Sequence, residues 1–147
     1  MWMTEHTEET NASPVQLWAR YAEPARWPEW DHEAEQVTVR GPMAVGTRGR
    51  LKPVGGPAVP FVFTSVTPNV EFTDVSRLPM GRLTFAHSIA ATATGSRFTH
   101  RVTITGLLAP LYRRVIGRGI AAGLPGAMQT LAGLAEGSQV PDAPIRR

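Results

Sequence analysis

The spacing of apolar residues changes twice along the chain and so divides it into three parts. Residues 2–11 alternate and are rich in threonine, which predicts a first strand. Ser13 and Pro14 then place a capping residue before a proline at the first helical position, which predicts a helix start. The apolar residues that follow at near-helical spacing are Val15, Leu17, Trp18 and Tyr21. Pro24 is expected to end this helix.

The segment ARWPEWD, residues 25–31, follows the first helix and holds two of the four tryptophans of the chain. Pro28 removes an amide donor and restricts Trp27, so this segment can form at most a short second helix or a turn.

The middle of the chain reads as strands separated by Gly, Pro and Asn clusters, which close antiparallel hairpins. The clusters are GPMAVG, PVGGP, TPN, LPMG and TGS. The expected strands are residues 35–40, 48–53, 59–67, 70–78, 82–93 and 96–105. With the first strand they make a seven-stranded meander.

The last part, residues 107–136, has apolar residues at helical spacing and predicts one long helix. Pro125 and the glycines around it predict a bend or break near Ala121. Residues 137–147, GSQVPDAPIRR, have the composition of a flexible C-terminal tail.

The order strand, two helices, six antiparallel strands and a long helix predicts an α+β fold in which a curved seven-stranded sheet grips the last helix. At 147 residues the chain suits one domain. We expect that domain to span residues 1–136.

Composition and charge exclude several classes of protein. The chain has no cysteine, so no disulfide or thiolate metal site is expected, and it has neither a signal-like N-terminus nor an apolar run long enough to cross a membrane. The net charge is +3, and the arginines are spread thinly along the sequence, with one modest cluster at Arg113, Arg114 and Arg118. We therefore expect a cytoplasmic protein that does not bind nucleic acid.

Four stretches resemble the polyketide cyclase/dehydrase branch of the START-like, Bet v 1-like (SRPBCC) superfamily. They are NASPVQLWARYAEPARWPEWD, GPMAVGTRGRLKP, RLTFAHSIAAT and GSRFTHRVTITGLLAPLY. The resemblance spans the chain to about Glu136 and implies the helix-grip fold, with a ligand cavity between the concave sheet face and the long helix. It does not decide the chemistry, because a fold hosts many functions.

Alternation places two histidines on the face of the sheet that lines this cavity. His87 shares a face with the apolar residues of strand 82–93, and His100 does so on strand 96–105. A turn centred at Thr94-Gly95 would make the two imidazoles diagonal neighbours. A hairpin at Pro79-Met80 would set Asp74 diagonal to His87, within reach of its ring.

His6 and Glu8 approach His100 if the first strand pairs with strand 96–105 through its Trp2–Thr10 face. This register is open, because a slip of one residue would turn both side chains outward.

An imidazole titrates near neutrality, and a carboxylate beside it fixes its tautomer. His87, His100 and Asp74 are therefore the candidate catalytic residues, acting as general acid and base in a cyclisation or dehydration. The alternatives are that each histidine satisfies a local hydrogen bond and that Asp74 lies solvated at the pocket mouth. A metal site built from two histidines and a carboxylate is disfavoured, and the glycines of GTRGR and PVGGP fit hairpin turns better than a phosphate loop.

Trp27 and Trp30 have two interpretations. They either seal the end of the domain, because indole buries much area in a short helix, or contact the ligand directly. The full set of candidate ligand-binding residues is Trp27, Trp30, Phe61, Phe63, Phe72, Phe85, Phe98, Val102, His6, Glu8, Val115 and Met128.

The function expected from the sequence is the binding of a hydrophobic small molecule, polyketide or lipid-like, in an internal cavity, by a monomer or homodimer without a cofactor. It leaves open whether the protein is a cyclase/dehydratase or a non-catalytic carrier. A third interpretation, a partner-binding regulator, would use the arginines Arg113, Arg114 and Arg118.

Overall fold

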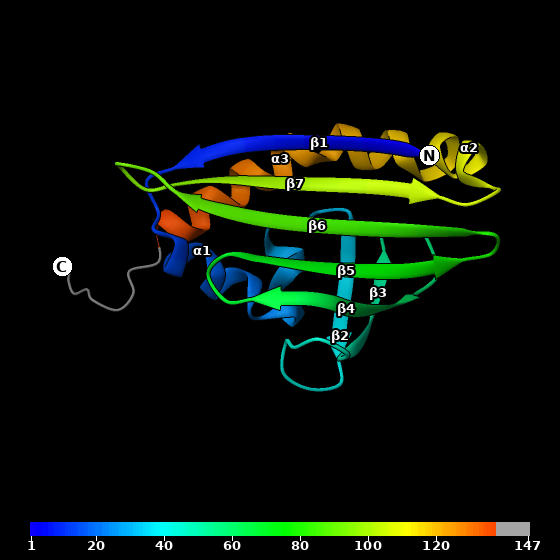
Figure 1. Ribbon diagram of the computed structural model, residues 1–147, viewed down its shortest axis with the longest axis horizontal. Helices are drawn as coiled ribbons and strands as arrows, with labels where there is room; N and C mark the ends of the chain where they lie inside the picture. Colours follow the sequence, from blue (N-terminus) through cyan, green and yellow to red (C-terminus); the bar gives the residue numbers. More distant parts are fainter. Residues whose placement is uncertain (138–147) are drawn as a thin grey trace.

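Seven antiparallel strands form one sheet, and a long C-terminal helix lies across it (Figure 1). This arrangement is seen in a computed structural model that describes residues 1–137. The strands are β1 (Trp2–Thr10), β2 (Ala34–Val39), β3 (Arg48–Pro53), β4 (Val59–Thr67), β5 (Glu71–Leu78), β6 (Gly81–Ala91) and β7 (Ser96–Thr105). Their order in the sheet is β1-β7-β6-β5-β4-β3-β2, so β2 to β7 form a meander and β1 pairs with β7 rather than with β2, which a meander of all seven strands would require.

The helices are α1 (Pro14–Tyr21), the 3₁₀ helix η1 (Pro24–Glu29), α2 (Ala109–Tyr112), the π-helical turn η2 (Arg113–Gly117) and α3 (Arg118–Glu136). α1 begins as the sequence predicts, because the Ser13 hydroxyl accepts from the Gln16 backbone N–H (3.2 Å) and the Gln16 side chain accepts from the Ser13 N–H (2.8 Å). The α+β helix-grip architecture is thus in place. The predicted tail lies, apart from Gly137, outside the described residues.

Of the bend or split predicted near Ala121, the split is wrong. α3 continues through Pro125, and the departure from α-helical geometry falls earlier, in η2. Pro125 removes only one helical hydrogen bond, which the packing of α3 against β1 and α1 can outweigh. Gly117 closes η2 against the Trp2 indole, and a Cβ there would lie 3.1 Å from it. The irregular turn therefore occurs where the helical region contacts β1. Local sequence does not reveal this contact, because the two segments are far apart in the chain.

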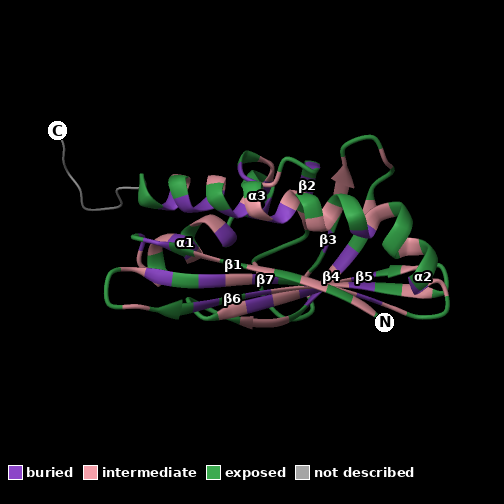
Figure 2. Ribbon diagram, turned by 90° about the horizontal axis from the view of Figure 1, so that it is seen from above, coloured by how far each residue is buried: buried purple, intermediate pink, exposed green. Residues whose placement is uncertain are grey.

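The core lies between the concave face of the sheet and the helices. Figure 2 shows buried residues on the sides of α1 and α3 that face the sheet. On α3 the buried stripe is Leu124, Met128, Leu131, Ala132 and Ala135. Among residues 1–137 no helix is long and apolar enough to span a bilayer.

The β6–β7 register differs from the prediction. His87 pairs directly with His100, rather than with Val102, and Ala91 pairs with Ser96 across a four-residue loop. In that loop the Thr92 N–H donates to the Gly95 carbonyl (2.9 Å), and Gly95 lies against the Thr10 carbonyl oxygen with no room for a Cβ. The loop is therefore shaped by the β1–α1 corner. The shift is two residues, so both imidazoles keep the inner face but become direct neighbours.

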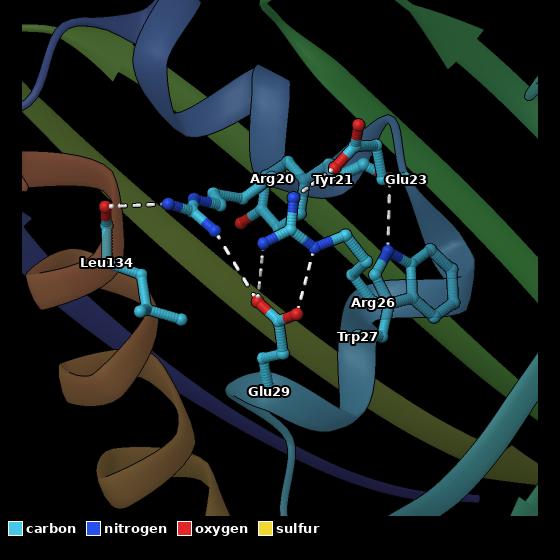
Figure 3. A network of polar contacts seen from close by, with 7 residues as sticks. All are labelled: Arg20, Tyr21, Glu23, Arg26, Trp27, Glu29 and Leu134. Carbon is cyan, nitrogen blue, oxygen red and sulfur yellow. Dashed lines mark hydrogen bonds and ion pairs between the residues drawn. The ribbon is translucent and has the colours of Figure 1, made fainter. Parts of the chain in front are cut away.

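An ion pair joins the two short helices, and a hydrogen bond ties them to the end of α3 (Figure 3). The Arg20 guanidinium lies 3.5 Å from the Glu29 carboxylate and donates to the Leu134 carbonyl (3.3 Å). The Trp27 indole N–H donates to the Tyr21 carbonyl (3.0 Å). These contacts hold η1 under α1, where its tryptophans reach the interior.

Candidate functional site

Two imidazoles and a phenol meet in the interior of the protein. The ring centroids of His87 and His100 are 4.6 Å apart, and the Tyr21 hydroxyl forms a 2.7 Å hydrogen bond with His100 Nε2. His87 stacks on Phe72 (3.9 Å, 7°), and its Nδ1 lies 3.2 Å from the Phe72 carbonyl oxygen. The direct β6–β7 register and the last residue of α1 bring these rings together.

Burial keeps this cluster uncharged. It lowers the pKa of His87 to about 3, and it lowers the pKa of His100 well below 6.5, with smaller contributions from His87 and His6. Burial also raises the pKa of the Tyr21 hydroxyl, so the phenol stays protonated. At neutral pH the three groups can exchange hydrogen bonds but carry no charge.

Asp74 is buried on the same inner face. It pairs with Phe63 on β4 and Phe85 on β6, the second of which the sequence predicts correctly. No hydrogen bond or ion pair reaches its carboxyl group within residues 1–137. Burial, and secondarily the charge of Asp31, raise the pKa of Asp74 to about 8. The carboxyl is therefore protonated at neutral pH, and the predicted contact with the His87 ring is not formed.

Trp30 carries a second buried polar group without a partner. Its indole Nε1 is the one fully buried side-chain nitrogen or oxygen in the described part of the chain that makes no hydrogen bond. The indole ring lies 6.0 Å from Tyr21 and 5.8 Å from His100. Trp30 thus extends the polar cluster toward η1.

A cleft of about 570 Å³ opens between α3 and the loop from η1 to β2. Its lining residues are Asp31, His32, Glu33, Ala122, Gly123, Gly126, Ala127, Gln129 and Thr130. The small residues of α3 leave the groove open, and a Cβ on Gly126 would meet nothing within 4 Å. Burial raises the pKa of Asp31 at the cleft wall. Asp31 directly follows Trp30 in the chain and its charge acts on buried Asp74, so the loop that carries Trp30 also forms one wall of the cleft.

His6 and Glu8 lie on the inner side of β1 and are half-buried. His6 pairs directly with His100, so the predicted β1–β7 pairing and facing are present. The two side chains bond each other, with 2.6 Å between His6 Nε2 and Glu8 Oε2, and the Gln129 amide donates to Glu8 at 3.4 Å. They therefore link β1 to the α3 wall of the cleft.

The remaining candidates divide by burial. Trp27, Phe61, Phe63, Phe72, Phe98, Val102 and Met128 are buried, and Phe85 is partly buried. Trp27 stacks between Phe61 and Phe72. Val115 is 68% exposed in η2, so it does not face the interior, because the π-helical turn carries it outward.

Sequence reasoning missed three features of this site. Tyr21 lies on the apolar stripe of α1. A buried tyrosine hydroxyl needs a hydrogen-bond partner, and this requirement could have indicated that Tyr21 contacts a polar group in the interior. Asp31 directly follows Trp30, and Gly123 and Gly126 leave one face of the helix without side chains, but neither pattern specifies a cleft.

Within residues 1–137 no three His, Asp or Glu side chains lie close enough together to bind a metal ion. Gly46 and Gly55 lie in turns and have positive φ.

Comparison with known proteins identifies relatives of this arrangement. A family model described as "Polyketide cyclase / dehydrase and lipid transport" matches residues 1–136. No curated protein matches the chain by sequence.

Several solved structures share the fold. Protein MLL2253 from Mesorhizobium loti has a TM-score of 0.74 at 20% identity, over 95% of this chain and 100% of that one. Norcoclaurine synthase from Thalictrum flavum, in complex with dopamine and hydroxybenzaldehyde, gives 0.69 at 18%, over 93% and 87%. The di-domain ARO/CYC StfQ of the steffimycin biosynthetic pathway gives 0.73 at 16%, over 91% of this chain and 50% of that one. These likenesses confirm the helix-grip fold.

Proposed function

The chain belongs to the polyketide cyclase / dehydrase and lipid transport family, and on that premise we propose that it binds a hydrophobic small molecule between α3 and the sheet. The ligand would enter through the cleft beside Gly126 and lie against Trp30. The aromatic residues around Trp30 suit a polyketide or lipid-like skeleton, whereas the cleft through which it would enter is lined by small and polar residues.

The observation that carries the proposal is the pair of unpartnered polar groups in the interior, on Trp30 and Asp74. Buried polar groups in folded proteins nearly always have a hydrogen-bond partner. The Trp30 indole N–H has none, and neither does the protonated carboxyl of Asp74. A ligand that brings a carbonyl or hydroxyl oxygen would supply an acceptor for these donors. The proposed ligand is therefore apolar with at least one oxygen.

Binding without catalysis fits the state of the histidines. His87 and His100 are buried with lowered pKa values, so at neutral pH they are poor proton donors. His100 is already bonded to Tyr21, and His87 faces the Phe72 carbonyl. In this proposal they form the polar floor of a carrier site. We also propose that the protein is cytoplasmic and acts as a monomer or homodimer.

A second candidate, a cyclase or dehydratase, is favoured by Asp74 alone. A carboxylic acid with a pKa of about 8 can give up a proton near neutral pH. In a dehydration the ionised form of Asp74 would take the proton from the carbon beside the carbonyl and return it to the departing hydroxyl, which leaves as water. Under this function Asp74→Asn abolishes product formation but leaves ligand affinity within about threefold.

Titration with a neutral apolar fluorophore, N-phenyl-1-naphthylamine, tests the binding site. Gly126→Leu fills the cleft and is expected to weaken binding at least about tenfold. Gly133→Leu is the matched control, because it places the same side chain on the same helix, with open space and away from the cleft. Saturable binding that Gly133→Leu retains and Gly126→Leu loses supports the proposal. Equal binding by both variants, or no saturable binding by the unaltered protein, contradicts it.

A further inference from the structure

Exposed apolar side chains gather where the C-terminal helical region begins. Leu107, Leu111 and Val115 are spaced four residues apart and are 84%, 50% and 68% exposed. Leu111 in α2 and Val115 in η2 are about one helical turn apart, and Leu107 lies in the turn directly before α2. They cover nothing in the core, which α3 fills with its own stripe. They form an unpartnered apolar face at one end of the molecule, where α2 is labelled in Figure 1.

The β5–β6 turn adds a fourth apolar side chain to this face. Met80 is 62% exposed, and its carbonyl accepts from the Leu108 N–H (3.0 Å). Gly106, with φ +106°, allows this approach, because a Cβ there would lie 2.6 Å from the Met80 carbonyl oxygen. Met80 itself has φ +54°, a conformation that a residue with a side chain adopts at a cost. The turn is thus held against the helix start with its methionine in solvent.

The same segment is strongly basic. Residues 106–135 contain Arg113, Arg114 and Arg118 and no Asp or Glu. All three arginines are exposed, and none forms an ion pair or hydrogen bond within the described residues. Arg97 and Arg101 differ, since each pairs with a glutamate on β1. The positive charge beside the apolar face is therefore uncompensated.

We propose that this face docks on the surface of an anionic lipid bilayer. The docking surface consists of Met80, Leu107, Leu111, Val115, Arg113, Arg114 and Arg118. Its apolar side chains would enter the boundary between headgroups and acyl chains, while the guanidinium groups bind lipid phosphates. A polyanion such as nucleic acid would satisfy the arginines but leave the apolar side chains in water. The combination of both therefore favours the bilayer.

Docking would also place the ligand cleft close to the membrane. The helical region that carries the docking surface continues directly into α3, whose residues 122–130 form one wall of the cleft. The inference goes beyond the proposed function and does not depend on it, because docking requires no bound ligand.

Vesicle flotation tests the docking surface. Partitioning is measured on phosphatidylcholine vesicles with and without about 30 mol % phosphatidylserine. Since each arginine near an anionic surface contributes roughly fivefold, the triple change Arg113→Gln/Arg114→Gln/Arg118→Gln is expected to weaken partitioning about a hundredfold. The change Leu107→Gln/Leu111→Gln/Val115→Gln should weaken it at least about tenfold, with the fold intact because these side chains are exposed.

The matched control removes three other exposed arginines, Arg40, Arg48 and Arg50, as glutamines. These residues lie in and beside the strands at the opposite edge of the sheet, and the control is expected to partition like the unaltered protein. Three results overturn the inference: no binding to anionic vesicles, an equal loss in the control, or heparin binding without vesicle binding.

Discussion

The buried carboxyl of Asp74 should make the stability of the protein depend on pH, and Asp74→Asn should remove that dependence. The fold favours the protonated form, because burial raises the pKa of Asp74 from 3.8 to about 8. Between these values the folded state keeps a proton that the unfolded state has lost. Stability therefore falls as the pH rises through this window. Below about pH 4 the Asp74 carboxyl is protonated in both the folded and the unfolded state. Above about pH 8 it is ionised in both states, and the folded state then bears the full free-energy cost of burying the charge.

The size of the effect follows from the two pKa values. Each pH unit between 3.8 and about 8 lowers the free energy of unfolding by about 1.4 kcal/mol, so the full cost is about 6 kcal/mol. Between pH 5 and pH 8 the expected difference is about 4 kcal/mol. Asparagine has nearly the same shape and does not titrate. Asp74→Asn should therefore gain about 4 kcal/mol relative to the unaltered protein across that range.

Urea denaturation followed by circular dichroism, at pH 5, 6, 7 and 8, measures this difference. His87 and His100 have lowered pKa values, so they reduce stability as the pH falls below about 6.5. This contribution is common to both proteins and cancels in the comparison. Glu9→Gln removes an exposed carboxylate instead and serves as the control. A stability difference between Asp74→Asn and the unaltered protein that stays constant from pH 5 to pH 8 would refute the reasoning.

Three further substitutions test the packing, each by the midpoint of urea denaturation. Tyr21→Phe leaves His100 Nε2 buried without its 2.7 Å partner and should cost about 1–3 kcal/mol; no loss would mean that the bond contributes nothing. Gly95→Ala brings a methyl group against the Thr10 carbonyl and should cost about 3 kcal/mol, and an unchanged midpoint would contradict the close approach. Gly126→Ala has open space on a helix and should gain about 0.5–1 kcal/mol, whereas destabilisation would mean that the cleft is narrower than described.

Local sequence patterns specify most of the fold, because alternating residues mark the strands and clusters of Gly, Pro and Asn mark the turns. The Pro79-Met80 turn fixes the pairing of Asp74 with Phe85, as predicted. The β6–β7 loop escapes prediction, because its length is set by contact between Gly95 and the β1–α1 corner, far away in sequence. For the same reason the irregular turn falls at η2, where Gly117 meets Trp2, and not at Pro125.

The candidate site is less accessible to sequence reasoning than the fold. Alternation correctly brings His87 and His100 to the inner face, because a two-residue register shift does not change the side of the sheet. It gives no indication that Trp30 lacks a hydrogen-bond partner or that Asp31 acts on Asp74, since both depend on how η1 packs under α1.

The most direct measurement of the proposed binding site is the indole N–H resonance of Trp30 in ¹H–¹⁵N spectra. The four tryptophans give four such signals, and Trp27 serves as an internal control because its N–H is already bonded to the Tyr21 carbonyl. Saturation with 2-acetylnaphthalene should shift the Trp30 signal strongly and leave that of Trp27 nearly unchanged. The hydrocarbon 2-ethylnaphthalene, which offers no acceptor, should shift it less. A Trp30 resonance that does not move when the ketone saturates the protein would contradict the proposal.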